Sequence, residues 1–117
     1  DVDELAMLVR FPVGPEDAVW KEESTPARKL TAVVRFTDQN AAIVESNASK
    51  GDAATQHSTA TENWFPGELL AQSEMSGDGR ITGTSYPATE FIQPPFSDGR
   101  ITRVPGTPFF ILELNAR

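Results

Sequence analysis

The segment 107–114, which contains the run Phe109-Phe110-Ile111-Leu112, most constrains what this chain can fold into. Successive side chains of a strand point to opposite faces, and both faces of this segment are apolar. We therefore expect a strand that is covered on both sides by other parts of the fold. Residues 5–11 and 30–36 are also apolar on both faces, so we predict two further strands there.

Each of these two N-terminal segments is followed by residues that favour a helix. Pro15 precedes two acidic residues, and proline followed by acidic residues is typical of a first helical turn, which predicts a helix over 15–23. After the second segment, Thr37 is suited to the N-cap of a helix that Gly51 would end. The N-terminal half is therefore expected to hold two strand-helix units.

The C-terminal half is rich in residues that favour strands. Residues 80–93, 99–104 and 107–114 carry Ile, Thr, Tyr, Phe and Val, and Gly and Pro separate them. This pattern predicts a mainly antiparallel meander. The expected fold class is α+β, with residues 1–117 forming a single domain of two N-terminal strand-helix units followed by the meander.

The sequence Asp-Gly-Arg-Ile-Thr occurs twice, at 78–82 and at 98–102. Asp-Gly favours tight turns because glycine adopts positive φ without steric cost, so we predict that each copy is a turn followed by the start of a strand. A calcium loop is excluded at the first copy because Ser85 takes the position of the required glutamate, and at the second because the loop would begin at Pro94. The glycine spacing also fails the dinucleotide-binding pattern.

Composition narrows the class of protein and its partners. Hydrophobic residues make up 38% and charged residues 23% of the chain, as in ordinary globular domains. The apolar runs are too short to cross a bilayer, and no stretch clusters the Lys and Arg that bind nucleic acid, so we expect neither a membrane nor a nucleic-acid partner. The chain begins at Asp1 rather than Met, which fits a cleaved leader or a trimmed chain, and the compartment stays open.

The net charge of −7 is concentrated in two parts of the chain, residues 1–27 and 62–90. An acidic surface is suited to contact with another protein. We expect the partner to be either a second copy of the chain, which would cover a strand edge in a homodimer, or a basic protein held by charge.

The candidate ligand-binding residues are the aromatic residues Trp64, Phe65, Tyr86 and Phe91, with His57, the only histidine. Trp64 and Phe65 precede a predicted short helix and are expected to pack inward, where such residues also line ligand grooves. His57 lies in the segment 52–62, which is expected to be a loop or an exposed strand.

No catalytic motif can be assigned. The absence of cysteine and the single histidine exclude thiolate and multi-histidine metal sites, and we expect no metal and no cofactor. His57 is followed by Ser58 and Thr59 without a recognisable nucleophile motif. We therefore favour a non-catalytic binding or protein-interaction domain. The alternative is a small hydrolase- or isomerase-like enzyme that uses an Asp or Glu, with or without His57, in an aromatic-lined pocket.

Overall fold

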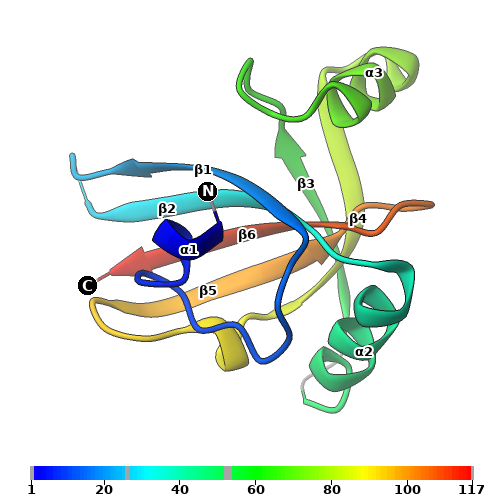
Figure 1. The fold of residues 1–117 in the computed structure, drawn as a ribbon. Coiled ribbons are helices and arrows are strands. Elements are labelled where there is room, and N and C mark those ends of the chain that lie inside the picture. Colours follow the sequence, from blue (N-terminus) through cyan, green and yellow to red (C-terminus); the bar gives the residue numbers. More distant parts are fainter. Residues whose placement is uncertain (1, 26, 52–53, 117) are drawn as a thin grey trace.

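The framework of the protein is one antiparallel sheet. Within residues 2–25, 27–51 and 54–116, which the computed structural model describes, six strands lie in the order β1-β2-β6-β5-β4-β3 (Figure 1). The strands are β1 (Asp17–Glu23), β2 (Lys29–Arg35), β3 (Thr55–Ala60), β4 (Arg80–Pro87), β5 (Phe96–Arg103) and β6 (Phe109–Ala116).

The helices are α1 (Val2–Leu5), α2 (Asp38–Ala48), α3 (Gly67–Ser76) and the 3-10 turn η1 (Thr89–Phe91). Thr37 is the N-cap of α2, because its hydroxyl accepts a hydrogen bond from the Asn40 N–H at 3.1 Å, as the sequence predicts. The α+β class and the C-terminal meander β3–β6 are also confirmed.

The expected strand over residues 5–11 is wrong. α1 ends at Leu5, and the chain then continues in turns, in which the Val9 N–H donates to the Leu5 carbonyl at 3.0 Å. Leu5 and Val9 are both fully buried, whereas Met7 is 78% exposed. The apolar residues therefore follow a spacing of four and not of two, which the alternation of a strand would have required.

The expected helix over residues 15–23 is also wrong, because these residues form β1. β1 pairs along its whole length with β2, and this pairing places Asp17 opposite Arg35 and Glu23 opposite Lys29. Ala18 is buried and Trp20 is half-buried in the core. The local preference for a helix is worth only tenths of a kcal/mol for each residue (about 0.7 at most). Pairing with the buried strand β2 has overridden this preference.

Strand β4 belongs to two parts of the sheet. Its residues 80–85 pair with β3, and its residues 84–87 pair with β5. Figure 1 shows β3 and α3 rising from the rest of the sheet together with the start of β4. We call residues 55–83 the arm. The Lys21 Nζ of β1 lies 3.7 Å from the Glu62 Oε1 of the arm, so the arm reaches back to the opposite end of the strand order.

Each face of the sheet carries its own apolar core. Ala32 and Val34 of β2 pack on the first face with α1, α2 and η1, whereas Val33 lies in the second core with Phe65 and Leu69 of the arm. β6 alternates in the same way and is buried on both faces from Phe109 to Leu112. The strand that the sequence predicts to be covered on both sides is therefore confirmed.

The two Asp-Gly-Arg-Ile-Thr copies have different structures. Gly79 has φ +67° in the turn before β4, and the pKa of Asp78 is lowered because the Ser76 hydroxyl and the Arg80 N–H donate to its carboxylate. The first copy is thus the predicted turn. The second prediction is wrong, since Asp98 and Gly99 lie within β5, just after a shift in its register with β6. There a Cβ on Gly99 would lie 2.4 Å from the Glu113 carbonyl oxygen, so glycine is required for close strand approach.

Candidate functional site

One pocket lies between the end of α2 and η1, and we call it the α2–η1 pocket. It has a volume of about 410 Å³. Its apolar walls are Pro12, Val44, Ala48, Pro87 and Phe91, and Asn47, Lys50 and Glu90 are among its polar lining residues. This volume lies within the range of small-molecule sites, and a mainly apolar lining with a few polar groups is typical of them.

Local contacts fix the η1 wall of this pocket. The Phe91 N–H donates to the Ala88 carbonyl at 2.8 Å, and the Phe91 carbonyl accepts from the Arg10 N–H at 2.9 Å. The Phe11 ring meets the Phe91 ring edge-on, with 6.3 Å between the centroids. The N-terminal segment therefore packs against Phe91. Of the four sequence-predicted aromatic residues, only Phe91 lines the pocket.

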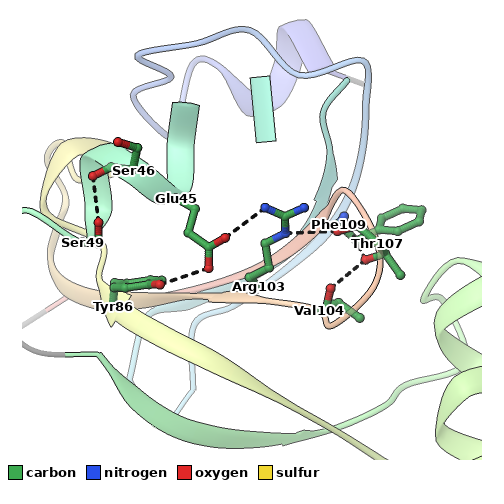
Figure 2. Close-up of polar contacts among 8 residues, drawn as sticks. All are labelled: Glu45, Ser46, Ser49, Tyr86, Arg103, Val104, Thr107 and Phe109. Carbon is green, nitrogen blue, oxygen red and sulfur yellow. Dashed lines mark hydrogen bonds and ion pairs between the residues drawn. The ribbon is translucent and has the colours of Figure 1, made fainter. Parts of the chain in front are cut away.

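A half-buried polar contact holds α2 in place. The Glu45 carboxylate accepts from the Tyr86 hydroxyl and from Arg103 Nη1, each at 3.0 Å, and Figure 2 shows Glu45 between these two residues. Burial, followed by the contact with Glu45, raises the pKa of Tyr86 above its ordinary value of 10.0. Arg103 also donates to the Thr107 carbonyl at 3.1 Å. These contacts join α2 to β4 and β5, so Tyr86 serves as an anchor for the helix.

The remaining predicted aromatic residues lie on the other face of the sheet. Phe65 is buried against α3, and the Trp64 ring meets it at a centroid distance of 4.7 Å. The Trp64 Nε1 is buried and donates to no acceptor within the described ranges. The structure therefore places Tyr86 and Phe91 in the core of the first face and Trp64 and Phe65 in the core of the second face, so the four residues do not form one aromatic pocket.

His57 lies in a different hollow, which we call the polar cleft. It has a volume of about 220 Å³ and is lined by Lys29, His57, Asp98, Gly99, Arg100, Glu113 and Asn115. The His57 Nε2 lies 3.0 Å from Glu113 Oε1, and the Thr59 hydroxyl donates to the same oxygen at 3.1 Å. The segment around His57 is the edge strand β3, in agreement with the expectation of a loop or an exposed strand.

The main contact of the His57 side chain therefore joins the arm to β6. Its Nε2 contacts Glu113, so only Nδ1 is left for any reactant. Among the residues that the structure describes, no group of three His, Cys, Asp or Glu side chains is placed to hold a metal ion. In the same residues, no helix has the length and apolar character that crossing a membrane would need.

Sequence reasoning did not single out Lys29, Arg100 or Glu113. Glu113 carried a signal, because it is a charged residue inside the most apolar strand of the chain. Lys29 and Arg100 carried none, since their placement beside Glu113 depends on the register of β2 and β5 with β6.

Comparison of the chain with protein-family models, with curated proteins and with solved structures gave no significant match to any of them.

Proposed function

We propose that this protein is a non-catalytic binding domain that holds a small, mainly apolar molecule in the α2–η1 pocket. The observation that carries the proposal is the pocket itself, with its volume of about 410 Å³ and its largely apolar walls. Transfer of apolar ligand surface from water onto Val44, Ala48 and Phe91 would supply the affinity. Asn47, Lys50 and Glu90 would orient the polar end of the ligand.

A binding role is favoured over the form of the enzyme alternative that uses His57, because the groups that such an enzyme would combine lie apart. His57 lies in the polar cleft, whereas Phe91 and Glu90 line the α2–η1 pocket. A general base must lie within hydrogen-bonding reach of the reacting group. An aromatic-lined site that combines His57 with a carboxylate is therefore not supported by this arrangement.

The proposal is tested by titration with the fluorescent probe anilinonaphthalene sulfonate, which has an apolar body and one charged end. Saturable binding is expected for the unmodified protein. Ala48→Phe fills the pocket and should weaken binding about tenfold or more, which corresponds to ~1.4 kcal/mol. Ala42→Phe is the matched control, because Ala42 is exposed on the same helix and does not line the pocket.

Asn47→Phe provides a second obstruction at a lining position, should Ala48→Phe disturb the packing of α2. Circular dichroism checks that each variant is folded. Equal binding by the wild type and both filled variants, or no saturable binding at all, would contradict the proposal.

A further inference from the structure

The polar cleft holds two positive side chains without acidic partners. Arg100 lies directly opposite Glu113 in the β5–β6 register, and Lys29 lies opposite Asn115 in the β2–β6 register. Within the described residues, neither Lys29 nor Arg100 takes part in an ion pair. Both side chains therefore present their donors to the cleft and to solvent.

For Arg100 the reason is that the carboxylate opposite it across the strand pair is already engaged. Glu113 Oε1 accepts from His57 Nε2 at 3.0 Å and from the Thr59 hydroxyl at 3.1 Å, and the Glu113 side chain is only 18% exposed. The other carboxylate of the cleft, Asp98, accepts from the Gly99 N–H at 2.9 Å. The arm thus supplies the partner of Glu113 and leaves Arg100 free, although Arg100 faces Glu113 across the strand pair.

We propose that the polar cleft binds a small oxyanion, the carboxylate or phosphate group of a metabolite, through Arg100 and Lys29. A guanidinium donates two parallel hydrogen bonds to either group, and a lysine adds a compact charge. The Asn115 amide lines the same cleft as a further donor. A volume of about 220 Å³ admits a small acid or one acidic group of a larger molecule.

This site has a different chemistry from the α2–η1 pocket, and it shares no lining residue with it. The two proposals therefore stand independently. The anion site draws its affinity from charge, so it should weaken as ionic strength rises, whereas binding of an apolar molecule in the α2–η1 pocket should change little.

The test is a titration followed by amide chemical shifts, with inorganic phosphate in one arm and succinate in the other. Chloride replaces each anion to keep the ionic strength constant. Saturable shifts are expected at Arg100, Glu113 and Asn115 in at least one arm, and the arm with the stronger binding identifies the preferred acid.

The variant carrying Lys29→Gln and Arg100→Gln should bind the preferred anion about tenfold more weakly or worse, and Arg10→Gln should bind as the wild type does. Arg10 is the control because it is exposed and lies outside the cleft lining. All three positions are exposed, so folding should be retained. The proposal is overturned if neither anion gives saturable shifts in the cleft, or if the double variant and the control lose affinity equally.

Discussion

His57 Nε2 lies 3.0 Å from Glu113 Oε1, although β4 and β5 separate the strands that carry these two residues. Neighbouring strands of a sheet are about 4.8 Å apart, so a flat sheet would hold β3 and β6 more than ~10 Å from one another. The contact therefore requires the arm to fold over the second face of the sheet. It closes the polar cleft on one side and leaves Arg100 without a carboxylate partner.

Removal of this contact should loosen the arm. His57→Ala and Glu113→Ala are each expected to lower the free energy of unfolding by about 1–2 kcal/mol, because a polar group in a half-buried site loses its hydrogen bond. The double variant should cost less than the sum of the two, with a coupling of about 1 kcal/mol. Urea unfolding of the four proteins measures the coupling, and strictly additive losses would show that the two side chains do not interact.

The two Asp-Gly copies should respond differently to the same substitution. Gly79→Ala places a side chain at φ +67° with nothing within 4 Å, and should cost about 1 kcal/mol. Gly99→Ala places Cβ against the backbone of β6 and should cost about 2–3 kcal/mol.

Gly67→Ala is the control for this pair, because its Cβ would also meet nothing within 4 Å and its φ is not in the positive range. Thermal unfolding ranks the three variants. A larger loss for Gly79→Ala than for Gly99→Ala would mean that β5 and β6 do not approach as closely as described.

The sequence was sufficient to predict those elements whose apolar pattern or capping residues agree with their surroundings in the fold. β2, β6 and α2 are of this kind, with Thr37 as the N-cap of the helix. The pattern failed at residues 15–23, where local helix signals compete with pairing to a distant strand. The α2–η1 pocket and the polar cleft were not predictable because each is lined by segments far apart in the sequence, whose relative placement no local pattern encodes.

The raised pKa of Tyr86 predicts a loss of stability at alkaline pH. The folded state binds the Tyr86 proton more tightly than the unfolded state does, so the free energy of unfolding falls as the pH rises above the ordinary value of 10.0. Tyr86→Phe has no hydroxyl proton to lose. Its free energy of unfolding should therefore fall less than that of the wild type as the pH rises. Urea unfolding at about pH 9 and about pH 11 compares the two proteins, and equal slopes would rule out a folded-state shift.

Arg80 should protect the outer edge of β3. The Thr61 N–H donates to the Gly79 carbonyl, and alternation along an antiparallel pair then directs the Ser58 carbonyl to the unpaired edge. Arg80 Nη2 donates to this carbonyl at 2.8 Å and Arg80 Nε donates to the Ser58 hydroxyl at 2.7 Å. A positive side chain over an edge strand opposes pairing with a second chain.

Arg80→Ala should therefore self-associate more readily than the wild type or Arg10→Ala. Light scattering at high protein concentration and at two salt concentrations measures the mass, and a dimer formed through strand edges should respond little to salt. A variant that stays monomeric would show that Arg80 is not what keeps this edge unpaired.

The most direct test of the proposed binding function is a screen of small apolar molecules followed by amide chemical shifts on the unmodified protein. We predict that the molecules that bind share saturable shifts at Val44, Ala48 and Phe91, and that Ala48→Phe weakens their binding about tenfold or more while Ala42→Phe does not. The absence of any molecule that shifts these residues, or equal affinity in Ala48→Phe and the wild type, would contradict the assignment of the α2–η1 pocket as the ligand site.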